Sequence, residues 1–142
     1  GRQEELARQA EIQARLDALA LRERIDRMKR ASVEKRLEAL EKAYPATAVL
    51  LTLGVRGCIC RKDGTTYTMG SCKVNAVDTT AAGDTFAGFF LGSLSRGMDI
   101  PASLLTATRA SALAVQKQGA AQSVPTLDEV NACTLIPGSV WL

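Results

Sequence analysis

Residues 2–43 contain neither glycine nor proline, and this uninterrupted stretch constrains the fold more than any other feature of the sequence. Ala, Glu, Arg, Leu and Gln dominate it, and these residue types have high helix propensities. Apolar side chains fall on two different helical faces, one formed by Ile12, Leu16 and Leu19 and another by Leu21, Ile25 and Met28. The stretch is therefore predicted to be helical almost throughout.

The change of phase, together with a suitable N-cap at Ser32, predicts two helices rather than one. We expect helices at about 3–30 and 33–43, with a break near 31–32, forming a charged helical leader at residues 1–43. The change of phase disfavours one long coiled-coil seam. A helical hairpin, or a homo-oligomer assembled through the N-terminal helices, remains an alternative.

The leader also holds 20 of the chain's 33 charged residues. The basic residues between positions 22 and 30 alternate with Glu23 and Asp26, which favours a solvated helix face over a phosphate-binding one. The net charge of the 142-residue chain is only +3, which is too small to indicate nucleic-acid binding. No nucleic-acid partner is expected.

Several classes of protein are excluded by what the sequence lacks. Its most apolar run, residues 46–55, is far shorter than the roughly 20 residues of a membrane-spanning helix. The charged N-terminal stretch has no apolar core of a signal peptide, so we expect no membrane partner and a cytoplasmic location. There is no histidine, which excludes Ser-His and Cys-His nucleophiles and His-based metal sites. The cysteines at positions 58, 60, 72 and 133 are predicted to be free, largely buried thiols.

After Pro45 the pattern changes to short strands followed by helices. Residues 48–53 form a continuous apolar run, which predicts a strand buried on both faces. Two further strands flank Asp63-Gly64, a dipeptide suited to a type I′ turn, and residues 73–77 read as another short strand. Helices are predicted at 82–96 and 101–117, with a last short one starting at Thr126 or Leu127. These elements predict an α/β body at residues 44–133, followed by a tail at 134–142.

Residues 76–88 join a strand to a helix through small side chains. Small residues let backbone N–H groups approach a ligand, and four such groups are unpaired at the start of a helix. This arrangement is an anion hole suited to phosphate. Asp84 inside it could handle a proton from an attacking hydroxyl. The alternative is that Asp78 and Asp84 are ordinary caps, and spacing alone does not decide between the two.

Three motifs in this body resemble those of the ribokinase-like (PfkB) carbohydrate kinases. Residues 78–86 (DTTAAGDTF) are similar to the family signature, residues 51–57 (LTLGVRG) to its nucleotide-side strand and turn, and residues 118–125 (QGAAQSVP) to a segment near its C-terminus. The resemblance covers about residues 37–132. It implies a partial Rossmann-like layered sheet with helices, preceded here by the helical leader.

The resemblance also implies an activity, namely transfer of the γ-phosphoryl group of ATP, with Mg²⁺, to a sugar hydroxyl. Asp84 would be the catalytic base, and Ala81, Ala82 and Gly83 would supply backbone donors to the transferring group. The adenine nucleotide would lie against Thr52, Gly54 and Gly57. Potassium-activated members hold K⁺ with an Asp side chain and loop carbonyls, and the matching positions are Asp78, Thr80, Ala114, Lys117, Gly119 and Ser123.

The chain departs from the family in one large respect. Members are about twice its length, and residues 1–43 show none of the family's glycine-rich sugar-binding motifs, its lid or its Asn-x-x-Glu motif. The chain therefore looks like the nucleotide-side half of such a kinase, in the form of a truncated, recombined or engineered product. This puts the sugar acceptor in doubt and predicts weak or absent activity. The alternative is a non-catalytic module that keeps the fold and carries a helical oligomerisation leader.

Overall fold

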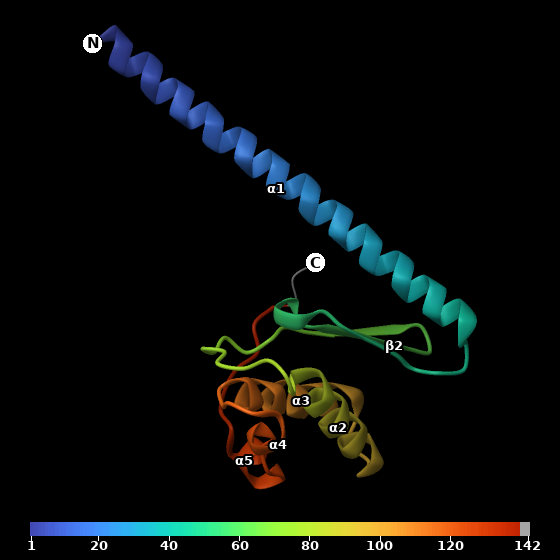
Figure 1. The fold of residues 1–142 in the computed structure, drawn as a ribbon. Coiled ribbons are helices and arrows are strands. Elements are labelled where there is room, and N and C mark those ends of the chain that lie inside the picture. The colour runs from blue at the N-terminus through green and yellow to red at the C-terminus, as the bar shows by residue number, and fades with distance from the viewer. Residues whose placement is uncertain (140–142) are drawn as a thin grey trace. The chain divides into compact units, whose positions relative to one another are not determined.

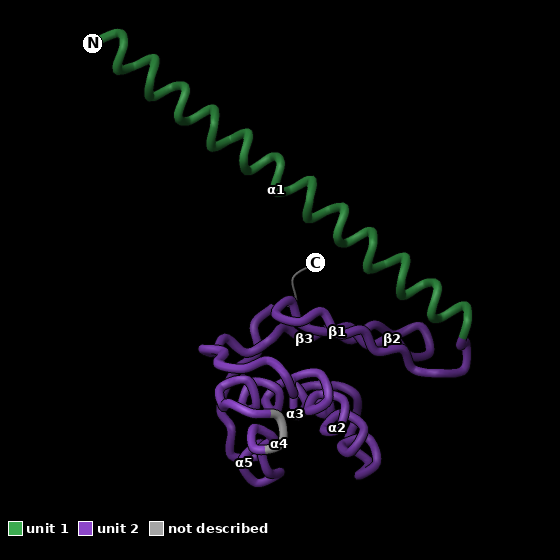
Figure 2. Tube along the Cα trace, viewed as in Figure 1, with its two compact units in different colours: residues 1–43, 142 green, residues 44–141 purple. Residues whose placement is uncertain are grey.

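The computed structural model describes residues 1–139 and divides them into two compact units, residues 1–43 and residues 44–139 (Figure 2). The first unit is a long helix, and the second is a mixed α/β body with a small antiparallel sheet (Figure 1). Within the described residues, no helix has both the length and the apolar character needed to cross a membrane.

The first unit is the single helix α1 (Arg2–Ala43). The predicted break near residues 31–32 is wrong, because the helix continues through Ser32. Relative to good helix formers, a serine inside a helix costs only about 0.5 kcal/mol. Each residue that continues the helix adds a backbone hydrogen bond. A change of apolar phase therefore does not end a helix that lacks glycine and proline.

The second unit begins with three antiparallel strands in the order β1-β2-β3. They are β1 (Val49–Thr52), β2 (Cys58–Lys62) and β3 (Thr65–Met69), with the short 3-10 helix η1 (Gly54–Arg56) between the first two. Asp63 and Gly64 have φ angles of 50° and 79°. Positive φ at both central residues defines a type I′ turn, so the predicted hairpin is confirmed.

Two predictions about the strands are wrong. Within residues 1–139, β1 pairs only with β2 and is therefore an edge strand, and Val49 is the one buried residue of its four. Residues 73–77 form no strand. The amides of Val77 and Asp78 instead donate to the carbonyl of Val115, at 2.6 and 3.1 Å. That segment is thus tied to the end of a helix and not to the sheet.

The predicted helices of the body are confirmed, and they are α2 (Ala82–Ser95), α3 (Ile100–Val115) and α5 (Leu127–Ala132). A further single turn, α4, spans Ala120–Ser123. Asp99 caps α3 by accepting a hydrogen bond from the amide of Ala102 at 2.8 Å. Thr126 and Glu129 form a reciprocal capping box at the start of α5. Local capping signals therefore determine where α3 and α5 begin.

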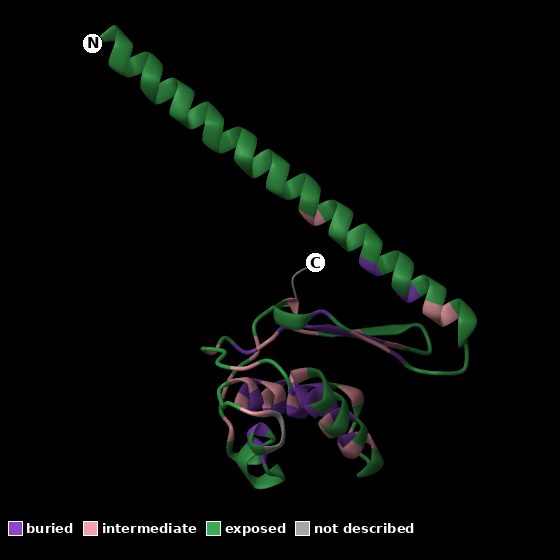
Figure 3. Ribbon diagram, in the orientation of Figure 1, coloured by how far each residue is buried: buried purple, intermediate pink, exposed green. Residues whose placement is uncertain are grey.

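The core of the body lies between the sheet and the pair α2 and α3 (Figure 3). Cys58 and Cys60 of the central strand pack against buried side chains of the helices, namely Phe86, Phe90, Leu104 and Ala107. The rings of Phe86 and Phe90 are stacked with their centroids 6.4 Å apart. The opposite pattern holds in α1, whose side chains are mostly exposed (Figure 3).

Candidate functional site

The N-terminal end of α2 carries backbone donors without acceptors. Ala81 occupies the N-cap position, and its side chain makes no capping hydrogen bond. The amide of Ala82 donates to the carbonyl of Thr79 at 3.2 Å, and that of Thr85 donates to Ala81 at 2.9 Å. Between them, the amides of Gly83 and Asp84 donate to no acceptor among residues 1–139. Two unpaired donors at the positive end of a helix suit an anion.

Gly83 keeps this helix end open. It has no left-handed backbone angle, and a Cβ at this position would have no heavy atom within 4 Å outside its own helical turn. Neither backbone conformation nor packing requires a glycine here. The missing side chain leaves space in front of the two free amides, as a cradle for a ligand requires.

That end of α2 opens on a cavity of about 290 Å³ in the body. The predicted nucleotide-binding positions Thr52, Gly54 and Gly57 line the same cavity as Ala82 and Gly83. The fold thus brings together five predicted site residues from segments that lie about 25 to 30 residues apart in the chain. Most of the lining is small or apolar, so backbone groups are accessible to a ligand.

The turn after β1 requires both of its glycines. Gly54 and Gly57 have φ angles of 60° and 107°, in a region that other residues rarely adopt. A Cβ on Gly57 would lie 2.2 Å from the carbonyl oxygen of Met69. The amide of Leu53 donates to the carbonyl of Gly57 at 2.8 Å, which closes the turn. The cavity wall at this point is therefore a tightly held backbone loop.

Asp84 and Ala81 do not line this cavity. They line a second, more open depression together with Thr80, Thr85 and Arg96. The Asp84 carboxylate is exposed there, while its amide belongs to the helix end described above. The backbone donors and the carboxylate are thus presented by the same turn of α2 to two adjoining depressions.

Asp78 accepts hydrogen bonds from two loops. Its Oδ1 accepts from the amide of Thr80 at 2.9 Å and from the Thr80 hydroxyl, and its Oδ2 accepts from the amide of Gly119 at 3.1 Å. The Thr80 hydroxyl bond, then the Thr80 amide bond, then the Gly119 bond lower the pKa of Asp78 below its ordinary value. Asp78 therefore stays ionised while it ties the loop before α2 to the loop after α3.

The predicted cation-binding positions are only partly assembled by these contacts. Asp78, Thr80 and Gly119 are joined directly, and the amide of Lys117 donates to the carbonyl of Ala114 at 3.2 Å beside them. Ser123 is buried in α4. A carboxylate offers about four lone-pair positions, of which three are occupied here. Any further ligands would have to be mostly backbone carbonyl oxygens, since residues 1–139 hold no group of three or more Cys, Asp or Glu side chains suited to a metal.

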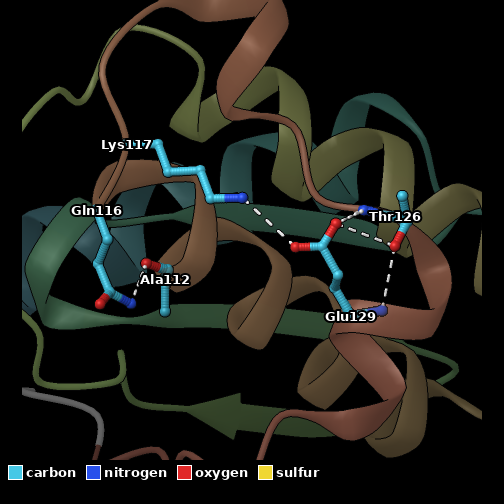
Figure 4. A network of polar contacts seen from close by, with 5 residues as sticks. All are labelled: Ala112, Gln116, Lys117, Thr126 and Glu129. Carbon is cyan, nitrogen blue, oxygen red and sulfur yellow. Dashed lines mark hydrogen bonds and ion pairs between the residues drawn. The ribbon is translucent and has the colours of Figure 1, made fainter.

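The side chain of Lys117 points toward Glu129 of α5 (Figure 4). Its Nζ lies 3.4 Å from Glu129 Oε2. Hydrogen bonds from the amide and hydroxyl of Thr126, followed by the charge of Lys117, lower the pKa of Glu129. At a cation site Lys117 can therefore contribute only its carbonyl oxygen.

The thiols are free, as predicted, and two of them line the cavity. Burial raises the pKa of Cys58 to about 11, with a smaller contribution from the nearby Cys60. Burial also raises the pKa of Cys72. Both groups are protonated at neutral pH, so neither is a nucleophile.

The sequence interpretation missed one wall of the cavity, which α3 supplies. Its lining residues are Thr108, Ser111, Ala112 and Val115. They follow the i, i+3, i+4, i+7 spacing of one helical face, and this spacing was the available signal. The hydroxyl of Ser111 donates to the carbonyl of Ala82 at 3.3 Å and so connects this wall to the start of α2.

Known proteins of one family match the part of the chain that contains these motifs. The model of the pfkB family carbohydrate kinases matches residues 14–127, and so begins further toward the N-terminus than the motifs indicated. The ribokinase of Schizosaccharomyces pombe is 47% identical over 85 residues, which are 59% of this chain and 27% of that protein. The ribokinase of Staphylococcus aureus is 45% identical over 84 residues, which are 58% and 28% of the two chains. The chain thus spans little more than a quarter of the length of these relatives.

Solved structures agree with the sequence matches. Ribokinase from Cryptococcus neoformans in complex with ADP superposes with a TM-score of 0.57 at 36% identity, over 59% of this chain and 27% of that one. An Escherichia coli protein described as a candidate second ribokinase, solved with ATP and Mg²⁺, gives 0.58 at 28% identity, over 60% and 28% of the two chains. With its motifs, its cavity and a family match over most of its length, this chain belongs to the pfkB family of carbohydrate kinases.

Proposed function

We propose that this chain carries the nucleotide-binding and phosphoryl-transfer part of an ATP-dependent sugar kinase of the ribokinase type. One observation carries the proposal. The unpaired amides of Gly83 and Asp84 stand at the end of α2, where Gly83 lines the same cavity as Thr52, Gly54 and Gly57. The helix end supplies the phosphate site, and the glycine turn supplies the wall for the rest of the nucleotide.

The donors to the transferring phosphoryl group are the amides of Gly83 and Asp84. The amide of Ala82 already donates to Thr79, so this residue of the predicted cradle positions the donors instead of supplying one. Fixed donors aimed at the developing charge stabilise the transition state without reorganisation. Their role needs no side chain, which accounts for the small residues at positions 81–83.

Asp84 is the proposed catalytic base. A sugar hydroxyl would give its proton to the Asp84 carboxylate as its oxygen attacks the γ-phosphorus, and the bond to ADP would break. The exposed position of Asp84 in the open depression beside the cavity leaves room for an acceptor on that side. The base acts only on a hydroxyl held within about 3 Å.

Two cations belong to this proposal. Mg²⁺ neutralises phosphate charge when it arrives with ATP, and we assign it no residue of this chain. The proposed monovalent cation site, suited to K⁺, consists of Asp78, Thr80, Ala114, Lys117, Gly119 and Ser123. Oxygen ligands of this kind suit a hard ion. Such a site would hold the loops on either side of the phosphate cradle.

In this proposal the chain supplies neither the binding site for the sugar acceptor nor the whole sheet. We propose that the three strands form part of a larger Rossmann-like layered sheet, supported by TM-scores of 0.57 and 0.58 to proteins about twice as long. No sugar-binding residue is assigned among the described residues. Phosphorylation of a sugar such as ribose by the 142-residue chain alone is therefore expected to be very weak or absent.

Placement of the nucleotide is tested by adding a negative charge to the cradle. Calorimetry should show that Gly83→Asp binds Mg·ATP much more weakly than the unaltered chain, because the carboxylate repels phosphate. Folding should be retained, since an acidic residue in the first turn favours the helix dipole. Ala87→Asp, which adds the same charge one turn further along an exposed face, is the matched control. Equal affinities for all three chains would refute this placement.

Catalysis is tested with Asp84→Asn, which preserves shape and removes the base. Nucleotide binding without ribose-dependent ADP release from the unaltered chain would agree with the expected weak turnover and favour the non-catalytic module. Robust release that Asp84→Asn abolishes would show that this chain forms its own acceptor site. Robust release that survives Asp84→Asn would overturn the role of Asp84.

Self-association through α1 stays a prediction. The apolar residues Leu16, Leu19 and Met28 are 53%, 58% and 72% exposed, and burying them against a second copy would be favourable. Sedimentation velocity at high micromolar concentration tests it, and a monomer there would contradict it.

A further inference from the structure

The segment that follows α5 has no regular secondary structure, yet it is fixed to the body at three points. We call residues 134–139 the C-terminal strap. The carbonyl of Leu135 accepts a hydrogen bond from Nε of Arg109 at 2.9 Å. The amide of Gly138 donates to the carbonyl of Ser71 at 3.0 Å, and the carbonyl of Gly138 accepts from the amide of Gly70 at 3.1 Å. The strap is therefore paired with the chain just after β3.

A glycine is required where the strap meets the body. A Cβ on Gly70 would lie 2.1 Å from the carbonyl oxygen of Gly138, a distance that no packed structure accommodates. Gly70 does not have a positive φ angle, so its backbone conformation would accept an alanine. The strap is thus the reason for the glycine at this position.

A second close contact continues from Gly70 to the glycine turn. A Cβ on Gly57 would lie 2.2 Å from the carbonyl oxygen of Met69 and 2.8 Å from Cα of Gly70. The hydroxyl of Ser71 donates to the carbonyl of Val55 at 2.6 Å. Three stretches of backbone, at residues 55–57, 69–71 and 138, are therefore stacked in direct contact.

Two of these three layers line the cavity, and the third does not. Gly57, Gly70 and Ser71 are lining residues, whereas none of the described lining residues comes from the strap. The strap therefore contacts lining residues without lining the cavity itself. The strap contacts Gly70 through backbone atoms, so a shift of the strap would also shift this lining residue.

We propose that the C-terminal strap is a positioning element that fixes the glycine wall of the nucleotide cavity and thereby increases nucleotide affinity. The inference rests on the proposed function, because it takes the cavity as a nucleotide site. Without the strap, residues 70–71 lose two backbone hydrogen bonds and must be ordered when the ligand binds. Ordering the backbone of a single residue is enough to weaken binding by about tenfold.

The test uses the predicted collision between Gly70 and Gly138, with Mg·ADP as the probe. Gly70→Ala should weaken Mg·ADP binding by roughly tenfold, because the added methyl group displaces the strap. In a chain that ends at Cys133, affinity should already be reduced, and Gly70→Ala should then have no further effect. The matched control is Gly92→Ala in α2, where an added Cβ meets only the end of the Arg96 side chain at 3.6 Å. Additive losses would overturn the proposal.

A second pair of variants serves if the shortened chain fails to fold. Gly138→Pro removes the donor to Ser71, whereas Gly138→Ala keeps it and brings its Cβ only to an ordinary 3.7 Å from the Ser71 oxygen. Weaker binding of Mg·ADP by the proline variant alone is expected. Equal affinity of the two variants would contradict the role of the strap.

A reciprocal readout separates positioning from simple stabilisation. If the strap and the nucleotide are coupled, Mg·ADP must slow hydrogen exchange at the Gly138 amide, although Gly138 does not line the cavity. A strap that only stabilises the fold would show unchanged exchange there, and this outcome overturns the proposal. If the unaltered chain does not bind Mg·ADP at all, the proposed nucleotide site is wrong and this inference falls with it. If it binds and Gly70→Ala binds equally well, the role of the strap alone is overturned.

Discussion

Helices α1 and α3 are both regular, but different interactions hold them. α1 has 42 residues and mostly exposed side chains, and its ion pairs join near neighbours such as Glu11 and Arg15, whose atoms lie 3.0 Å apart. α3 has 16 residues and buries eight of them. Apart from the buried Val33 and Leu37, the first helix follows from propensity and from contacts within four residues of each position. The second depends on segments far away in the chain, and the proposed nucleotide cavity lies along it.

The largest expected difference between the two regions comes from removing a leucine in each. Leu104 of α3 is 1% exposed, so Leu104→Ala should lower the free energy of unfolding by about 2–5 kcal/mol. Leu16→Ala in α1 should change it by less than about 0.5 kcal/mol, since Leu16 is 53% exposed. Urea unfolding followed by circular dichroism measures both. A loss at Leu16 as large as that at Leu104 would show that burial, and not local interaction, holds α1.

A smaller difference is expected from the helix ends. Thr126→Ala removes the capping box of α5 and should cost about 1 kcal/mol in chemical denaturation, and Thr126→Ser should restore most of it. Ser32→Ala in the middle of α1 should be neutral or slightly stabilising, because alanine has the higher helix propensity. A loss at Ser32 comparable to that at Thr126 would revive a helix start at that position.

Acid should affect the body through Asp78. Its hydrogen bonds lower its pKa in the folded state, so the unfolded chain takes up the proton first as the pH falls. The stabilisation is therefore complete above the ordinary pKa of 3.8 and is lost as the pH falls through the lower, folded value. The difference in stability between the unaltered chain and Asp78→Asn should shrink on acidification. Thr80→Val should show a smaller difference than Asp78→Asn, and a difference that grows toward low pH would contradict the network.

The smallest effect is expected for the exposed pairs of α1. Glu11→Gln should reduce helix stability by about 0.3–0.5 kcal/mol at low ionic strength and by less in high salt, because water and ions screen the pair with Arg15. Circular dichroism at two salt concentrations measures this. Glu23→Gln, which removes the same charge from a residue with no ion pair in the described part of the chain, controls for charge alone. A loss that does not depend on salt would rule out an ionic origin.

The candidate functional loop could be located from sequence because its chemistry is local. The small residues before α2, the helix start at Ala82 and the family motif all lie within a few positions of one another. The donor assignment could not be completed in the same way, because only the structure shows that the amide of Ala82 is already bonded to Thr79. The α3 wall and the Gly70 contact with the strap were likewise missed, since each joins residues that are far apart in sequence.

The sequence by itself determined those structural features whose physical cause lies within about four residues of the feature. The helical character of residues 2–43, the Asp63-Gly64 turn and the start of α5 are of this kind, because propensity, positive φ and capping act locally. Tertiary structure alone decided that β1 is an edge strand, that Val77 bonds to Val115 instead of a sheet, and that Gly138 lies against Gly70. A strand exists only when a neighbour accepts its hydrogen bonds, and a close contact exists only when two distant segments meet. Neither condition is contained in the residues of one segment.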